Sequence, residues 1–270
     1  MVKQTTGFAR FINRHTYYSS TPMRILLRLY SIYTYIIFVL TFLAFVPTMI
    51  VLAQKKRFHK TALQLNTAWS WIYFKAIFIK VKFSFEEKLE RGKTYIFCAN
   101  HFSYLDIPII AGLHLPFKFI GKSSIAKVPI FGYMFKTLHI TVNRSNIMSR
   151  ARSLKKTQES LKEGFNMMFF PEGGILTKSP PKMVGFKDGA FRLAIEENIP
   201  VVPITFPDNY VILPDDDSFM IRPRKCRVIV HKPIYPKDCQ NDIVSLKSMT
   251  KSTIEKELAK YHTENVGTVG

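Results

Sequence analysis

The sequence predicts an α/β fold, in which a mostly parallel central sheet is flanked by helices and preceded by a hydrophobic helical membrane segment. Two observations support this prediction. From Val81 onward, short apolar runs typical of buried strands alternate with longer helical stretches. Before that point, a long uncharged apolar run occurs in a stretch without acidic residues. We therefore divide the 270-residue chain into a membrane-anchoring part, residues 1–80, and an α/β part, residues 81–270.

The N-terminal part is basic and aromatic. No Asp or Glu precedes Glu86, and residues 1–85 hold 12 of the 39 Lys and Arg residues in a chain of formal net charge +20. Such a segment binds either nucleic acid or an anionic bilayer. A nucleic-acid-binding protein would spread its basic residues over the α/β part. Here the basic residues flank an apolar run, which favours the bilayer.

This uncharged run extends from Ser31 to Ala53, and its 23 residues are long enough to span a bilayer. Basic residues flank it on both sides, so the charges predict no orientation for a single span. Pro47 interrupts the run. A helical hairpin that enters one leaflet fits as well, with Leu63–Ile79 as its second helix and both basic flanks on the cytoplasmic side. The sequence leaves both arrangements open.

The α/β part contains seven strand-like apolar runs separated by helical stretches. The runs are Val81–Phe85, Tyr95–Cys98, Phe117–Ile120, Ile140–Val142, Met167–Phe170, Val201–Phe206 and Arg227–Val230. The expected helices are Tyr104–Gly112, Ile147–Glu163, Phe186–Glu197 and Ile243–Tyr261. Pro207–Pro223 is expected to be an irregular loop, because Pro and Asp punctuate it. In open α/β sheets, functional residues collect at the carboxyl ends of the strands.

A polar segment follows the second of these strands. His101 lies just past the strand, Ser103 is a candidate helix N-cap, and Asp106 has the spacing of a capping box. Across this turn the two side chains can converge. The carboxylate then fixes the tautomer of His101, and the other ring nitrogen is free to take a proton from a hydroxyl. A lone His-x4-Asp spacing also fits a helix-capping Asp beside a polar loop histidine.

Three further segments follow later strands and favour the catalytic interpretation. They are Gly121–Arg144, Phe170–Gly174, and Gly185–Phe191 with Ile199–Ile204. With the His101 segment they form four blocks in an order that closely resembles the glycerolipid acyltransferases of the lysophosphatidic acid acyltransferase (PlsC) type. That family is known by His-x4-Asp, a Gly/Ile/Val-Arg block, Phe-Pro-Glu-Gly and an apolar-Pro strand. The resemblance covers about residues 90–210.

The resemblance implies the glycerolipid acyltransferase fold and a fatty acyl transfer from acyl-CoA or acyl carrier protein. The acceptor is the sn-2 hydroxyl of 1-acylglycerol-3-phosphate, and the product is phosphatidic acid. The hydroxyl attacks the thioester directly, so the family needs no acyl-enzyme, metal or cofactor. His101 would be the general base and Asp106 its orienting partner.

The same resemblance assigns residues to the acceptor. Arg144 matches the Arg of the second block and would bind the phosphate. Glu172 and Gly173 would lie beside the glycerol part of the acceptor. Lys187 is a second candidate for the phosphate, because it lies near an expected helix start. It also fits a solvated surface lysine.

One position departs from the family pattern. The third block usually continues as Phe-Pro-Glu-Gly-Thr-Arg, but Gly174 and Ile175 occupy the last two positions here. The missing Arg is often assigned to the acceptor phosphate, so that task shifts to Arg144 and Lys187. A different acceptor, such as glycerol-3-phosphate or an amino-acid-linked lyso-lipid, is therefore an alternative.

The remaining features bear on location and on other functional classes. Cys98, Cys226 and Cys239 lack metal-ligand spacing, and an odd count suits a reducing compartment. The family's cytosolic donor implies an enzyme anchored on the cytoplasmic face of the cell membrane. Its expected partners are anionic lipids, the lyso-phospholipid and the acyl donor, and not nucleic acid. A membrane-tethered lipid-binding protein with a dead site would have lost His101 or Asp106, and both are present.

Overall fold

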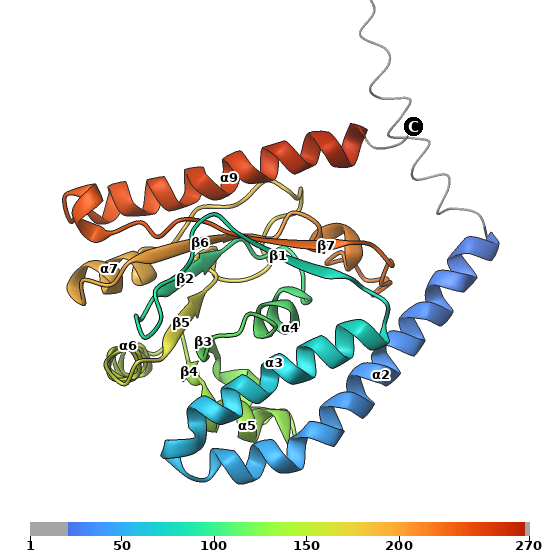
Figure 1. Ribbon diagram of the computed structural model, residues 1–270, viewed down its shortest axis with the longest axis horizontal. Coiled ribbons are helices and arrows are strands. Elements are labelled where there is room, and N and C mark those ends of the chain that lie inside the picture. Colours follow the sequence, from blue (N-terminus) through green and yellow to red (C-terminus); the bar gives the residue numbers. More distant parts are fainter. Residues whose placement is uncertain (1–20, 268–270) are drawn as a thin grey trace, which may run out of the picture.

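The computed structural model describes the backbone of residues 21–267 and the side chains of residues 21–261 (Figure 1). Within this part of the chain, seven strands form one sheet in the order β1-β7-β6-β2-β5-β3-β4. All neighbouring strands are parallel except the β6–β7 pair. The strands are β1 (Val81–Phe85), β2 (Ile96–Ala99), β3 (Phe117–Lys122), β4 (Ile140–Val142), β5 (Asn166–Phe169), β6 (Val201–Thr205) and β7 (Cys226–Val230). The predicted fold class is confirmed, and every strand begins and ends within two residues of its predicted bounds.

Helices cover both faces of the sheet, because its central strands are apolar on both sides (Figure 1). Phe97 of β2 belongs to the core under α3 and α4, whereas the adjacent Cys98 belongs to the core under α7 and α9. The α-helices are α2 (Thr21–Ala53), α3 (His59–Ala76), α4 (Asp106–Ala111), α5 (Phe131–Leu138), α6 (Ile147–Lys162), α7 (Gly189–Glu196), α8 (Asn209–Ile212) and α9 (Ile243–Gly267).

The two N-terminal helices form an antiparallel pair along one side of the molecule (Figure 1). The Tyr30 hydroxyl near the start of α2 donates to the carbonyl of Ile77 at 2.6 Å, just past the end of α3. Helix α2 continues through Pro47 and ends at Ala53. Helix α3 buries Tyr73 in the same core as the central strands, so the pair is packed onto the sheet.

Helix α2 is the one helix in the described residues that is long and apolar enough to cross a membrane. That finding rests on length and composition and is weak evidence of membrane association. The basic and aromatic residues before Thr21, which the sequence places in the membrane-anchoring part, lie outside the described residues.

Tertiary contacts override the local sequence signals at two points. The predicted irregular loop Pro207–Pro223 is irregular except for the four-residue helix α8, which the sequence did not predict and which buries Ile212 in the core. Helix α4 begins at Asp106 with Leu105 rather than Ser103 as its N-cap. The Ser103 hydroxyl donates instead to the carbonyl of Leu213 at 2.7 Å.

Candidate active site

His101 and Asp106 lie at the carboxyl end of β2, where the turn into α4 brings their side chains together. His101 Nδ1 and Asp106 Oδ2 are 2.7 Å apart. The carboxylate side chain is fully buried, and the imidazole is 14% exposed. Because a carboxylate accepts hydrogen bonds, the proton sits on Nδ1 and leaves the Nε2 lone pair free. No described residue forms a hydrogen bond with Nε2.

Asp106 is held by donors on both of its oxygens. Oδ2 accepts the backbone N–H groups of Phe102 at 3.1 Å and Ser103 at 3.2 Å. Oδ1 accepts Nδ2 of Asn209 at 2.6 Å. Asn209 is fully buried, and its Oδ1 accepts the Cys226 thiol at 3.2 Å. Sequence reasoning missed Asn209; its one signal is a polar side chain shortly after an apolar strand.

The imidazole of His101 is also held by stacking. The Phe170 ring lies with its centroid 4.0 Å from the imidazole centroid, and the two planes differ by 20°. Phe170 directly follows β5, the strand next to β2. Asn100 fixes the other side of the turn, because its amide exchanges hydrogen bonds of 2.8 and 3.1 Å with the backbone of Phe206. The histidine is therefore positioned by both neighbouring strands of β2.

Glu172 supports the backbone of the histidine. Its Oε1 accepts the N–H of His101 at 2.9 Å, and its Oε2 accepts the N–H of Val184 at 3.0 Å. The residue is 1% exposed. Burial raises the pKa of the Glu172 carboxyl, although the two backbone hydrogen bonds favour its charged form. Glu172 thus ties the turn after β5 to the turn after β2.

Two basic side chains meet at Gly173. Arg144 Nη1 donates to the Gly173 carbonyl at 2.5 Å. The Lys187 side chain passes over the same residue, where a Cβ on Gly173 would collide with Nζ. Gly173 also has a φ of +91°, which side-chain-bearing residues rarely adopt. Because a guanidinium has five N–H donors, Arg144 keeps donors for an anion in addition to its bond to Gly173.

A cavity of about 630 Å³ lies beside these turns. Phe102, which follows the histidine, lines it, and so does Ile175, at the position where the family usually has Arg. The other lining residues are Leu176, Thr177, Lys178, Pro180, Tyr210, Pro214 and Asp215. The volume is that of a typical small-molecule site.

Cys98 lies three residues before the histidine and is fully buried in the core. Burial raises the pKa of its thiol, so it is not a reactive thiolate. Among the described residues, no three or more His, Cys, Asp or Glu side chains are grouped so that they could hold a metal ion.

The sheet topology, together with the four motif blocks around its carboxyl edge, defines an α/β acyltransferase domain. Residues 80–207 match the family model described as Acyltransferase. This match covers just under half of the chain and agrees with the PlsC-type glycerolipid acyltransferases that its motif blocks resemble.

Similar proteins carry a common name. The 1-acyl-sn-glycerol-3-phosphate acyltransferase of Chlamydomonas reinhardtii is 37% identical over 175 residues, which are 64% of this chain and 52% of that protein. The protein of the same name in Saccharomyces cerevisiae is 30% identical over 196 residues, 71% of this chain and 60% of that protein. The chain thus spans about half the length of the curated relatives it matches.

A solved structure shares the fold. The crystal structure of the 1-acyl-sn-glycerophosphate acyltransferase PlsC from Thermotoga maritima matches with a TM-score of 0.70. The match covers 87% of this chain and 95% of that one, at 24% sequence identity. At this identity the likeness establishes the architecture and not the substrate.

Proposed function

We propose that this protein transfers a fatty acyl group from acyl-CoA or acyl carrier protein to the sn-2 hydroxyl of 1-acylglycerol-3-phosphate, giving phosphatidic acid. One observation carries the proposal: the 2.7 Å contact between His101 Nδ1 and Asp106 Oδ2, which leaves Nε2 of the histidine free. The names of the relatives support the choice of acceptor.

The proposed reaction follows from this geometry. Nε2 of His101 takes the hydroxyl proton while the acceptor oxygen attacks the thioester carbon. The buried carboxylate of Asp106 stabilises the imidazolium that forms. The tetrahedral intermediate then collapses, the carbon–sulfur bond breaks, and the imidazolium returns its proton to the departing sulfur. No covalent intermediate with the protein and no cofactor enters this sequence.

The acceptor phosphate is assigned to the two cations at Gly173. Arg144 offers its remaining guanidinium N–H groups, and Lys187 offers an ammonium above the same backbone turn. Glu172 contributes differently: its two oxygens are occupied by backbone N–H groups, which favours a positioning role for it over direct contact with the glycerol.

The proposal is tested with detergent-purified protein, a long-chain acyl-CoA and three acceptors offered side by side: lysophosphatidic acid, glycerol-3-phosphate and an amino-acid-linked lyso-lipid. We expect preference for lysophosphatidic acid. In the His101→Ala variant, transfer should fall about 10²–10⁴-fold, the usual contribution of a general base. A folded, fully active variant would remove His101 from the mechanism.

The alternatives have distinct outcomes in the same experiment. Preference for another acceptor would keep His101 and Asp106 as the catalytic pair and make Ile175 a specificity difference. No transfer from either acyl-CoA or acyl carrier protein would favour a lipid-binding protein with an inactive site. Salt-dependent oligonucleotide binding by the full chain would favour nucleic acid as the partner.

We further propose that the α2–α3 pair rests on the cytoplasmic leaflet and does not cross the membrane. One face of α2 exposes apolar side chains along its length, among them Ile25, Leu29, Ile32, Ile36, Leu40, Leu43 and Val51. The close packing of α3 onto the sheet keeps that face near the catalytic part. The test is a cysteine introduced at Thr21 or at Gln54, labelled from one side with a membrane-impermeant maleimide. Equal labelling supports the hairpin, and opposite labelling requires a span.

A further inference from the structure

A second cavity lies at the opposite end of α4 from the catalytic pair. Its volume is about 520 Å³, within the range of ligand sites. Gly112, which caps α4, lines it, whereas Asp106 begins the same helix. At 1.5 Å per residue the helix separates the two places by about 9 Å. The other lining residues are Ser70, Trp71, Ile72, Phe74, Lys75, Phe78, Ile79, Lys80, Val81 and Phe83.

The interior of this cavity is apolar. Phe74 and Ile79 are almost fully buried in the core beneath it. Ser70 is the exception among the inner residues, and its hydroxyl already donates to the carbonyl of Pro108 at 2.7 Å. Gly112 allows α4 to approach closely, because a Cβ there would lie 3.0 Å from the Ser70 hydroxyl oxygen. Such walls favour a hydrocarbon chain over a polar ligand.

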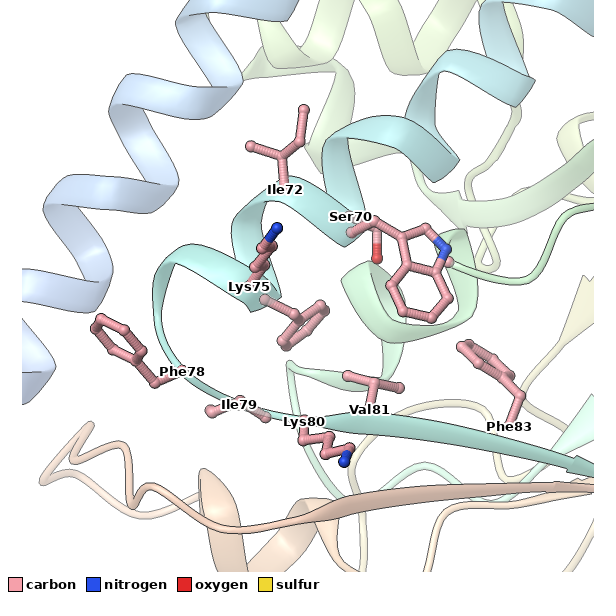
Figure 2. Close-up of a pocket in the computed structure, with 11 residues that line it drawn as sticks. Ser70, Ile72, Lys75, Phe78, Ile79, Lys80, Val81 and Phe83 are labelled. Atoms are coloured by element: carbon pink, nitrogen blue, oxygen red, sulfur yellow. The ribbon is translucent and has the colours of Figure 1, made fainter.

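The rim, in contrast, is basic. Lys75 comes from α3 and Lys80 from the segment that leads into β1, and Figure 2 shows both beside the cavity. Both are exposed, and no carboxylate among the described residues forms an ion pair with either. Phe78, between them, is 80% exposed and held at a φ of +60°, an uncommon conformation for a bulky residue. An apolar interior with two unpaired cations at the mouth matches an acyl chain with an anionic head group.

The cavity lies next to the membrane-facing surface proposed above. The Tyr33 hydroxyl of α2 donates to the carbonyl of Ala76 at 2.8 Å, so the first part of α2 lies against the end of α3. Trp71 and Ile72 on the same end of α3 are each about half exposed. Exposed aromatic and basic side chains together are typical of the interface between lipid head groups and acyl chains.

We propose that this cavity binds one acyl chain of an anionic bilayer phospholipid, whose phosphate pairs with Lys75 and Lys80. The proposal rests on the membrane association proposed above and not on acyl transfer. The bound lipid would hold the end of the α2–α3 pair at a fixed depth in the leaflet. It is distinct from the acceptor, which is assigned to the cations at Gly173.

The experiment uses tryptophan fluorescence of the full-length protein in vesicles. The chain has two tryptophans, Trp69 and Trp71, so Trp69→Phe leaves a single reporter that lines the cavity. The vesicles contain phosphatidylcholine and a minor fraction of phosphatidylglycerol, and one of the two lipids carries bromine on its acyl chain as a quencher. We expect brominated phosphatidylglycerol to quench Trp71 beyond its share of the bilayer, with a preference of about 30-fold for two lysines at one phosphate.

Charge variants separate a site from general attraction. Lys75→Gln/Lys80→Gln should abolish the excess quenching, whereas Lys155→Gln/Lys156→Gln removes the same charge from exposed positions on α6 and should leave it unchanged. The proposed lipid site would be refuted if brominated phosphatidylglycerol quenched Trp71 only in proportion to its fraction of the bilayer. An equal loss of excess quenching in the two double variants would refute it as well. If Trp69→Phe unfolds the protein, the difference between wild type and Trp71→Phe gives the same readout.

The same measurements distinguish failure of the lipid site from failure of the proposed membrane association. Quenching of Trp71 by brominated phosphatidylcholine without phosphatidylglycerol preference refutes the lipid site and leaves membrane association intact. No quenching by either lipid refutes membrane association and the site together. Acyl transfer is measured separately with detergent-dispersed substrates, and Lys75→Gln/Lys80→Gln should retain it there because neither lysine contacts the catalytic pair.

Discussion

Replacing Asn209 by Ala tests whether the donor set around Asp106 serves catalysis. The change removes the 2.6 Å hydrogen bond that Asp106 Oδ1 accepts, the one such bond that a described residue makes to this oxygen. Hydrogen bonds to charged groups contribute about 1.5–3 kcal/mol, which corresponds to about ten- to 150-fold in rate. Oδ2 keeps three donors, from His101, Phe102 and Ser103, so the carboxylate stays in place and the lower value applies. We therefore expect kcat to fall about tenfold.

The assay measures initial rates of acyl transfer over a range of lysophosphatidic acid concentrations. The KM should stay unchanged, because in the proposed reaction Asp106 stabilises an imidazolium that is absent from the substrate-bound ground state. Asn166→Ala is the matched control. Asn166 is also buried, and its Oδ1 accepts the Tyr95 N–H at 2.9 Å near the start of β5, away from the catalytic turn.

The two variants should lose similar stability, and only Asn209→Ala should lose kcat. If both lose kcat in proportion to the fall in Tm, or if Asn209→Ala raises KM at constant kcat, then Asn209 does not act through Asp106.

Three further predictions concern charge and backbone conformation. Burial raises the pKa of the Glu172 carboxyl above its ordinary 4.5. Glu172 therefore contributes its full stabilisation below pH 4.5, and this stabilisation is lost as the pH rises through the raised pKa. The Tm difference between wild type and Glu172→Gln should shrink from pH 4 toward neutrality. For Glu86, partial burial is the largest single influence and opposes ionisation, but the hydrogen bond and charge of His231, the Lys232 N–H and the charge of Lys260 together outweigh it and lower the pKa below 4.5. The Tm advantage of wild type over Glu86→Gln should therefore be present above pH 4.5 and disappear in acid, and the opposite slope would contradict this assignment. Gly173→Ala should displace Lys187 and raise the apparent KM for a phosphate-bearing acceptor, whereas Gly92→Ala, also at positive φ but in open space, should cost only about 1–2 kcal/mol of stability.

The central strands were predictable because each is a short apolar run that the fold buries, whereas β1 at the sheet edge is only partly buried. Ile96 and Cys98 face one core and Phe97 and Ala99 the other, so the run needs no polar alternation and stands out from its surroundings. The His–Asp pair was predictable for a related reason. Both residues belong to one local turn, so the spacing alone indicates that they can meet, although distant residues such as Glu172 and Asn209 help to hold them.

Asn209 and Phe170 could not be found in the same way. Asn209 reaches Asp106 across 103 residues of chain, and its segment carries the Pro and Asp residues of a loop. In the structure this segment forms helix α8 and buries both Asn209 and Ile212. The sequence predicts Phe170 as the last residue of an apolar strand. Its ring stacks on His101 because β2 and β5 are neighbours in the sheet. Contacts between elements are set by sheet order, which no local pattern encodes.

The structure helps to interpret Ile175, which stands at the position where the family usually has Arg. Ile175 lines the 630 Å³ cavity together with Phe102. Arg144 and Lys187 instead lie against Gly173, two residues earlier in the chain. Arg144 and Lys187 therefore supply positive charge at the glycine turn, and Lys178 lines the cavity itself, where Ile175 adds an apolar group to the wall. An isoleucine in that wall strengthens contact with hydrocarbon and gives no hydrogen bond to a phosphate. Under the proposed function, a lyso-phospholipid would place its phosphate at Gly173 and its acyl chain against Ile175, whereas glycerol-3-phosphate has no apolar portion for that wall.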